Sequence, residues 1–454
     1  MDVDTIAAVA TAPGAGAVAV VRVSGPAALD VLRRVAPGLD PLPPPRRAAL
    51  ATLRDPASGA PVDRGLVTVF PAPDSYTGED VVEISGHGGW MAPALVLEAC
   101  VAAGARPAAA GEFTRRAYLH GKMDLVQAEA VADLVEGRSR ALHAAALRQL
   151  DRGLSSRLAA LRERLVELEA LLVHHLDFPE EDEPPVPVSR VVEEGMALAE
   201  DLRRLVATAP EGELLREGAL TVLAGRPNSG KSSLFNALLG QERAIVTGLP
   251  GTTRDALEAV ASLGGFPFRL VDTAGLRETE EHVERLGIEV AERYLRAADL
   301  VLVCVEAGRD LDVRERTFLE RLEGRPAVVL RTKADLAGGS AGDSAGVDVP
   351  GVRVSVTSGE GLGRLRTLLP SLVYRGLVAS RGEVPVLLRE RQARGVQRAL
   401  DEVEAFAAAL QRGVPPEVAA SHLRPAETAL EETLGVISPE EVLDRVFSRF
   451  CIGK

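Results

Sequence analysis

The chain has 454 residues, 46% of them hydrophobic and 26% charged, which is typical of a folded protein and excludes wholesale disorder. This length exceeds what one hydrophobic core organises, so we expect two to four domains. The net charge of −13 argues against broad, non-specific nucleic-acid binding, although it allows a local basic surface.

The first 118 residues predict mixed strands and helices. Residues 1–30 are rich in Ala and Val, but Asp2 and Asp4 occupy the segment where a signal peptide carries basic residues. We therefore expect a strand, a Gly-rich turn and a second strand there, and a helix near residues 90–103. No apolar run in the sequence is long enough to span a membrane, so we expect a cytoplasmic protein.

Residues 122–176 predict helix. Leucines spaced three and four apart indicate one face of a long amphipathic helix: Leu150, Leu154, Leu158, Leu161, Leu165, Leu168 and Leu172. The acidic, Pro-rich segment 177–187 ends that helix, and a second helix is expected to reach about residue 208.

From Leu220 the pattern changes to α/β. The buried-strand runs TVLAG, FRLVDTAG, LVLVCVEA and AVVLRTKAD alternate with helical segments, and helix returns after about residue 376. The sequence thus predicts a multidomain α/β plus α protein. It would comprise an α+β N-terminal domain, a helical domain in two parts, and an inserted P-loop domain that has a mostly parallel sheet with helices on both faces. The expected bounds are 1–118, 119–217 with 376–454, and 218–375, respectively.

Rare residue types mark candidate positions. Only four of the 52 basic residues are Lys, namely Lys122, Lys231, Lys333 and Lys454. A position that stays Lys in an Arg-rich chain is a candidate for a role that needs a compact ammonium. The three cysteines indicate neither zinc nor a disulfide framework, because Cys100 and Cys304 fit core positions and Cys451 lies alone in FCIGK.

The segment GRPNSGKS, which begins at Gly225, fits the G-x-x-x-x-G-K-[ST] phosphate loop between a strand and a helix. Its glycines allow backbone N–H groups to turn toward phosphate oxygens, and the following helix adds its positive end. Lys231 is expected to reach the β- and γ-phosphates, and the Ser232 hydroxyl is expected to bind Mg²⁺.

Two further motifs follow, each at the end of a strand. Asp272 begins D-T-A-G, in which the Asp can hold Mg²⁺ through water and the Gly N–H can sense the γ-phosphate. Asp335 ends T-K-A-D, and its carboxylate can accept two hydrogen bonds from the N1–H and N2–H₂ edge of guanine, a donor pair that adenine lacks. The stem of Lys333 can cover the base. The three motifs in this order predict a GTPase.

The sequence departs from the common GTPase pattern at three places. Thr332 replaces the usual Asn of the guanine motif, which weakens one tethering contact, and SVT at 355–357 stands where S-A-K is common. Leu276 replaces the Gln that orients water in many GTPases. Either the protein is a slow switch, or a monovalent cation and a distant carboxylate replace that Gln. Asn228 offers an amide oxygen for such a cation.

Segments along the whole chain form a specific combination: DTIAAVATAPGAGAVAVVRVSG, SYTGEDVVEISGHGG, GEFTRRAYLHGKMDLVQAEAVADLVE, LDFPEED, GRPNSGKSSLFNAL, VTGLPGTTRD, DTAGLRET and FCIGK. Together they resemble the MnmE (TrmE) family of tRNA-modification GTPases. The resemblance implies a homodimer with an N-terminal tetrahydrofolate-binding and dimerisation domain, a helical domain, and an inserted G domain that K⁺ activates.

The resemblance also implies site residues. The expected K⁺ ligands are Asn228, Thr247, Leu249 and Thr252. The expected Mg²⁺ ligands are Ser232 and Thr253, and the expected catalytic residue, which positions the attacking water, is Glu284. The expected GTP contacts are Asn228, Ser229, Gly230, Lys231, Ser232, Ser233, Thr247, Gly248, Leu249, Pro250, Gly251, Thr252, Thr253, Asp272, Thr273, Ala274, Gly275, Thr332, Lys333, Ala334, Asp335, Ser355, Val356 and Thr357.

The family's folate contacts fall on Arg22, Glu83, Lys122 and Lys454. A 5-formyl- or 5,10-methylene-tetrahydrofolate offers a pterin edge to a carboxylate and a glutamate tail to cations. Cys451 lies near this site as a nucleophile, a ligand or a structural thiol. By resemblance the protein acts with an FAD-dependent partner of the MnmG type in a hetero-oligomer. Together they install an aminomethyl or carboxymethylaminomethyl group at C5 of the wobble uridine (U34) in tRNA.

Two other functions remain open at this point. A ribosome-assembly GTPase shares the G domain and the potassium-type loop but needs neither a folate domain nor an FCIGK tail. The second alternative is a folate-dependent one-carbon enzyme with a regulatory G domain. It differs from a tRNA-modification GTPase mainly in what the folate-binding half does. The Arg-rich stretches 138–164 and 380–398 are candidates for tRNA or partner contacts, with solvated helix faces as the alternative.

Overall fold

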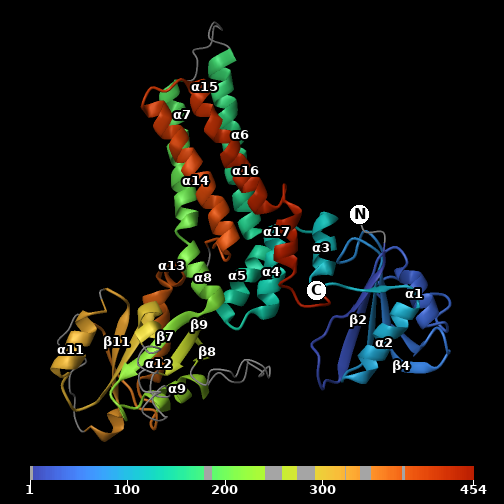
Figure 1. Cartoon of the computed structure of the whole chain (residues 1–454), viewed down its shortest axis with the longest axis horizontal. Coiled ribbons are helices and arrows are strands. Elements are labelled where there is room, and N and C mark those ends of the chain that lie inside the picture. The colour runs from blue at the N-terminus through green and yellow to red at the C-terminus, as the bar shows by residue number, and fades with distance from the viewer. Residues whose placement is uncertain are drawn as a thin grey trace. The chain divides into compact units, whose positions relative to one another are not determined.

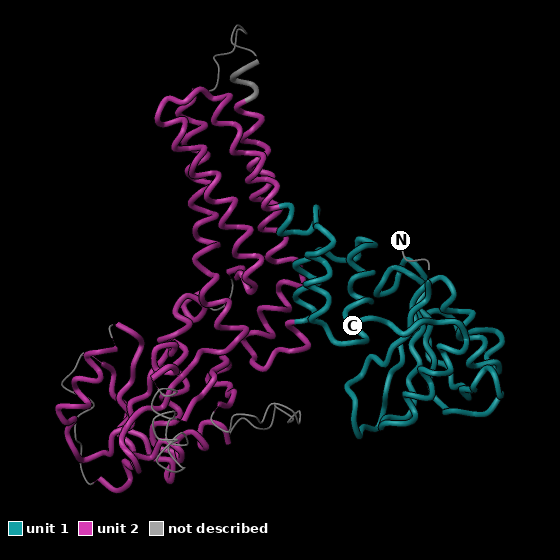
Figure 2. Tube along the Cα trace, viewed as in Figure 1, with its two compact units in different colours: residues 1–132, 431–454 teal, residues 133–430 magenta. Residues whose placement is uncertain are grey.

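The computed structural model describes residues 4–177, 187–240, 258–272, 292–322, 324–337, 349–380 and 384–454. The chain divides into two compact units, which Figure 2 colours separately: unit 1 comprises residues 1–132 and 431–454, and unit 2 comprises residues 133–430. Each unit contains one six-stranded sheet (Figure 1). Within the described ranges, no helix has the length and apolar character that crossing a membrane requires.

Unit 1 is an α+β unit whose sheet has the order β3-β4-β5-β2-β1-β6. Its strands are β1 (Ile6–Val9), β2 (Val18–Ser24), β3 (Ala49–Arg54), β4 (Pro61–Phe70), β5 (Val81–His87) and β6 (Arg106–Pro107). Helices α1 (Ala28–Val35) and α2 (Met91–Ala102) bury one face of this sheet through a shared core. The predicted strand, turn and strand at the N-terminus and the predicted helix near 90–103 are confirmed.

The segment 431–454 completes unit 1 by packing on α3 (Glu112–Leu119). Helix α17 (Glu440–Phe447) lies against α3, where the rings of Tyr118 and Phe447 are 6.3 Å apart. The Tyr118 hydroxyl also donates to the Gly435 carbonyl at 2.5 Å. Helices α4 (Leu125–Glu136) and α16 (Leu423–Leu434) run across the boundary between the units.

Unit 2 contains a sheet in the order β12-β11-β10-β7-β9-β8, which is parallel except for β8. Its strands are β7 (Ala219–Gly225), β8 (Glu258–Leu263), β9 (Phe266–Asp272), β10 (Leu300–Glu306), β11 (Ala327–Thr332) and β12 (Gly351–Arg353). Both faces are buried, by α9 (Lys231–Gly240) and α12 (Leu362–Val373) on one side and α11 (Val313–Glu320) on the other. The expected mostly parallel sheet with helices on both faces is therefore observed.

The remaining helices of unit 2 precede and follow this sheet in the sequence. They are α5 (Arg140–Leu150), α6 (Gly153–Asp177), α7 (Val188–Val206), α8 (Ala209–Glu217), α13 (Arg375–Ala379), α14 (Glu390–Gln411) and α15 (Pro416–Ala419). Helices α7 and α14 run side by side (Figure 1), and Gly195 of α7 lies beside the Phe406 ring of α14. Helices from before and after the sheet thus share one bundle.

The prediction of one long helix with Leu150 in its leucine face was wrong. Leu150 ends α5, and a new helix, α6, carries the buried leucines from Leu154 onward. The helix is interrupted at Arg152, which adopts a left-handed φ of 65°, and α6 begins at the next residue, Gly153. A left-handed residue cannot continue an α-helix, so the periodic leucines lie on two helices rather than one.

Tyr374 joins the sheet of unit 2 to the helices beside it. Its side chain is fully buried, and its hydroxyl oxygen lies 3.1 Å from the Leu214 carbonyl and 2.5 Å from the Pro267 carbonyl, which share its single proton. The same oxygen accepts from the Ala219 N–H at 3.3 Å. One hydroxyl group thus contacts the backbone of α8, of β9 and of the start of β7, and burial raises the pKa of Tyr374.

Candidate functional site: a nucleotide site and a C-terminal tail site

The phosphate loop connects the carboxyl end of β7 to α9. Gly225 has a φ of 141°, and a Cβ there would lie 2.4 Å from the Cys304 carbonyl oxygen. Gly230 and Asn228 also have positive φ, of 87° and 60°. Both glycines are therefore required by backbone geometry, and the loop has the left-handed turns that aim N–H groups at an anion.

Lys231 and Ser232 begin α9 below this loop. The Lys231 ammonium is buried and donates to the carbonyls of Gly225 at 3.0 Å and Arg226 at 2.7 Å. The Ser232 hydroxyl donates to Asp272 Oδ2 at 2.6 Å, which brings the first two motifs together. Oxygen atoms of this kind are the ligands that Mg²⁺ prefers, so the pair fits a magnesium site.

The guanine motif lies at the end of β11, beside the phosphate loop. The Thr332 hydroxyl donates to the Ser229 carbonyl at 2.7 Å and is fully enclosed. Thr332 therefore retains a tether between the two motifs at the position where Asn is usual. Lys333 follows with a φ of 55°, and its ammonium pairs with the Glu306 carboxylate at the end of β10.

Asp335 is exposed and is oriented by the segment 355–357. The Ser355 hydroxyl donates to Asp335 Oδ1 at 2.6 Å, and it in turn accepts from the Ser358 N–H at 3.1 Å. The Ala334 N–H donates to the Val354 carbonyl at 3.2 Å. Sequence reasoning expected 355–357 to contact guanine through its backbone. The structure shows a further contact of Ser355, because its side chain orients the Asp335 carboxylate.

Several predicted site residues lie outside the described residues. They are Thr247, Gly248, Leu249, Pro250, Gly251, Thr252, Thr253, Thr273, Ala274, Gly275, Leu276 and the catalytic candidate Glu284. Their expected roles remain predictions.

A second site lies on the sheet of unit 1, where Arg22 on β2 stands directly opposite Glu83 on β5. Arg22 donates to Glu83 Oε1 through Nε at 3.0 Å and through Nη2 at 2.8 Å. The guanidinium also lies 5.3 Å from the Tyr76 ring centroid and 5.6 Å from that of Phe113. Strand register and two aromatic rings thus hold this ion pair in place.

The segment CIGK reaches the same site. Ile452 bridges Ala110, and a Cβ on Gly453 would lie 2.4 Å from the Val9 carbonyl oxygen, so only Gly fits there. Lys454 is half-buried, and burial followed by the positive charge of Arg22 lowers the pKa of its ammonium. The structure therefore brings Arg22, Glu83 and Lys454 together.

Lys122 and Cys451 are the other two candidates, and the Cys451 carbonyl accepts from the Lys454 N–H at 3.3 Å. Lys122 donates to the Pro73 carbonyl at 2.9 Å, and its stem lies against Gly78. Cys451 is exposed, while Cys100 and Cys304 are buried as expected, and burial raises the pKa of each buried thiol to about 12. The proposed roles of Lys122 and Cys451 remain predictions.

Three residues at these sites were missed by sequence reasoning. Glu306 ends the apolar strand β10. Its position at the carboxyl end of a parallel strand was the one indication in the sequence that it could lie at the site. Tyr76 lies in the motif SYTGED and Phe113 in GEFTRR, but nothing in either segment indicates that both rings converge on Arg22.

Comparison with known proteins decides the family. A model described as the MnmE helical domain matches residues 125–451, and one described as the N-terminus of the GTP-binding protein TrmE matches residues 5–122. The tRNA modification GTPase MnmE of Halorhodospira halophila is 45% identical, with 100% of this chain and 96% of that one covered. This chain belongs to the MnmE family of tRNA modification GTPases.

As a member of the MnmE family, the protein is a GTP hydrolase that acts in tRNA modification, as the resemblance predicted. The relative from Heliobacterium modesticaldum, also named tRNA modification GTPase MnmE, is 42% identical with 99% of both chains covered. The model of the TrmE N-terminus matches residues 5–122. A ribosome-assembly GTPase, the alternative considered above, would not need this part of the chain.

Solved G-domain structures resemble parts of this MnmE-family chain. The G domain of T. maritima FeoB is 28% identical, with 32% of this chain and 93% of that one covered, at a TM-score of 0.25. Aquifex aeolicus Era bound to GDP·AlF₄⁻ is 20% identical, with 40% and 65% covered, at a TM-score of 0.27.

Proposed function

We propose that this MnmE-family GTPase helps to modify the wobble uridine (U34) of tRNA at C5 with an aminomethyl or carboxymethylaminomethyl group. A tetrahydrofolate derivative would supply the methylene carbon, and an FAD-dependent partner of the MnmG type would act with it in a hetero-oligomer. The electrostatic interaction of Lys454 with the ion pair of Arg22 and Glu83 supports this proposal most directly, because these residues form a charged site that GTP hydrolysis alone does not need.

The residues of unit 1 fit the chemistry of a folate. Both hydrogen bonds from Arg22 end on Glu83 Oε1, and a carboxylate has about four acceptor positions, so Glu83 has capacity for a pterin N–H. Lys454 and Lys122 would bind the anionic glutamate tail or the formyl oxygen. We propose that unit 1 also forms the homodimer contact implied by the family, and that Cys451 acts near the one-carbon unit.

At the nucleotide site, we propose that Lys231 contacts the β- and γ-phosphates and that Ser232 and Thr253 hold Mg²⁺. Bound Mg²⁺ would neutralise charge on the phosphate oxygens. The Ser232 hydroxyl is already oriented by Asp272, so this carboxylate positions the Mg²⁺ ligand. Asp335 would read the guanine edge while the stem of Lys333, anchored at Glu306, covers the base.

Asn228 leads to a prediction about cations. We propose that its amide oxygen, with Thr247, Leu249 and Thr252, binds K⁺, and that Glu284 positions the attacking water in place of the missing Gln. GTP hydrolysis is then expected to be roughly tenfold or more faster in K⁺ than in Na⁺ at equal ionic strength, since a cation replaces the charge of an arginine finger. Phosphate release measured in both salts checks this, and equal rates would refute it.

Deletion of the gene tests the tRNA function. The C5-modified wobble uridine is expected to disappear from total tRNA, as measured by mass spectrometry of digested nucleosides. Expression of the wild-type chain should restore it, and a chain with Lys231→Ala should not. Unchanged tRNA in the deletion strain would contradict the proposed function, whatever the GTPase rate.

We also carry forward the domain bounds 1–118, 119–217 with 376–454, and 218–375, and a cytoplasmic location. Support for the bounds comes from α7 and α14, which share one bundle although the sheet of unit 2 lies between them in the sequence. A protein that acts on tRNA works where tRNA is, which favours the cytoplasm.

A further inference from the structure

The Arg-rich stretch 138–164 divides into two parts that differ in ion pairing. On α6 the arginines are paired: Arg157 and Arg164 contact Asp201 at 2.9 and 2.5 Å, and Arg162 contacts Glu427 at 2.7 Å. Before α6 lie Arg138, Arg140, Arg148 and Arg152, which we call the basic stripe. All four are exposed, and none has an ion pair among the residues that the structure describes.

Helical geometry gathers the basic stripe on the outer face of α5. Its inner face is buried through Leu142, Ala145, Ala146 and Gln149. Arg140 and Arg148 are exposed on this helix eight residues apart, and the exposed Arg138 and Arg152 lie just before and just after it. Eight residues of helix rise about 12 Å, which matches three to four nucleotides along one strand of a duplex.

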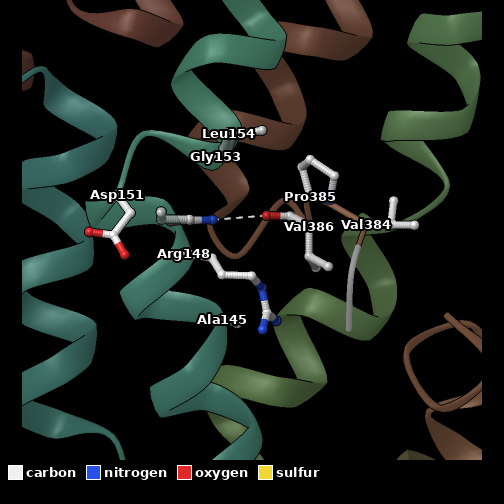
Figure 3. Close-up of a pocket in the computed structure, with 9 residues that line it drawn as sticks. Ala145, Arg148, Asp151, Gly153, Leu154, Val384, Pro385 and Val386 are labelled. Carbon is white, nitrogen blue, oxygen red and sulfur yellow. Dashed lines mark hydrogen bonds between the residues drawn. The ribbon is translucent and has the colours of Figure 1, made fainter. Parts of the chain in front are cut away.

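The surface at this end of α5 is also hollowed. Figure 3 shows Arg148 beside a cavity of about 220 Å³ whose opposite wall is Val384, Pro385 and Val386. The wall is fixed, because the buried Gln149 amide donates to the Val386 carbonyl at 2.8 Å. The start of α5 is fixed as well, since the Ser139 hydroxyl accepts from the Leu142 N–H and the Ala141 N–H donates to Gly265.

We propose that the basic stripe binds the phosphate backbone of tRNA, an inference that rests on the proposed function for its ligand. Guanidinium groups bind phosphate oxygens in a bidentate manner, and unpaired ones keep their full charge for it. The chain has a net charge of −13, but residues 138–152 contain these four arginines and a single carboxylate, that of Asp151, which leaves a local excess of positive charge. The stripe exposes His143, Ala144 and Leu147 but no aromatic side chain, which favours a phosphate ligand over a protein interface.

Fluorescence anisotropy with a labelled, unmodified tRNA transcript tests the proposal. Changing the four arginines to Gln in the full chain is expected to weaken tRNA binding roughly tenfold to a hundredfold at physiological salt. The slope of log affinity against log salt concentration should fall by about 3, because each lost phosphate contact removes about 0.7 to 0.9. GTP hydrolysis without tRNA should stay unchanged.

The control changes four arginines that are also exposed but ion-paired: Arg33, Arg203, Arg204 and Arg296. Their replacement by Gln removes the same charge and should leave tRNA affinity and the salt slope near wild type. If the fourfold stripe variant does not fold, Arg148→Gln alone should lower the slope by roughly 0.7 to 0.9.

Three outcomes separate the explanations. A stripe variant with wild-type affinity and slope would overturn the proposal. A variant that keeps tRNA but loses binding to an acidic polypeptide, tested with polyglutamate, would overturn it in favour of a protein partner. If the wobble uridine stays modified after the gene is deleted, this result would count against the proposed function. It would not bear on the basic stripe.

Discussion

Replacing Asp335 with Asn is expected to lower GTP affinity on the order of a hundredfold to a thousandfold, about 3–4 kcal/mol. In the proposed site the carboxylate accepts from both guanine N1–H and N2–H₂. An Asn amide would present its oxygen to one of these donors and its own N–H₂ donor to the other. XTP carries a carbonyl in place of the amino group, so the same variant should bind XTP more tightly than the wild type does. Fluorescent GTP and XTP analogues measure both affinities.

The control for this prediction is Asp310→Asn. Asp310 is exposed on the loop before α11 and is given no role in the nucleotide site, so its GTP affinity should match wild type. Ser355→Ala provides an intermediate case, because it removes only the hydrogen bond that orients Asp335. A weakening of about 0.5–3 kcal/mol is expected there. An Asp335→Asn variant with unchanged GTP affinity would show that guanine is read elsewhere.

Removing residues 451–454 is expected to abolish binding of 5-formyltetrahydrofolate while leaving GTP binding intact. The segment supplies the Lys454 ammonium, and it also covers the backbone of Val9 and Ala110. The lysine is positioned beside Arg22 although burial and that like charge both lower its pKa, which is an arrangement suited to an anionic ligand. Isothermal titration calorimetry with each ligand separates the two effects.

Point variants distinguish a lost ligand contact from a damaged fold. Lys454→Gln should lose most folate binding with little change in the thermal unfolding midpoint, whereas Gly453→Ala should disturb the tail because its Cβ would meet the Val9 carbonyl. Arg449→Gln, an exposed change nearby, serves as the matched control and should behave as wild type. Full folate affinity after loss of Lys454 would remove this residue from the proposed site.

Much of the nucleotide site could be predicted because its chemistry is local in sequence. The phosphate loop needs glycines, a lysine and a hydroxyl within a few residues, and the structure places Lys231 and Ser232 at the start of α9, directly after the loop. What Thr332 does could not be read from the sequence. Its tether to the Ser229 carbonyl depends on how far β11 and the loop lie apart, which is a property of the folded sheet.

The long-range contacts escaped sequence reasoning for the same reason. The pairing of Arg22 with Glu83 follows from strand register, and the convergence of Tyr76 and Phe113 on Arg22 follows from packing between distant segments. The leucine repeat was read as one helix because periodicity continues across Arg152, although the backbone turns there. Tyr374 gave no indication of its position between α8, β7 and β9.

The composition of unit 1 from residues 1–132 and 431–454 has a consequence for biosynthesis. At about 5–20 residues per second, the roughly 300 residues between these segments take about 15–60 s to be synthesised on the ribosome. During that interval α3 has no α17 to pack against, and the surface around Gly111 that later receives Phe447 and Phe450 is uncovered. A nascent chain in this state presents an apolar surface of the kind that chaperones bind.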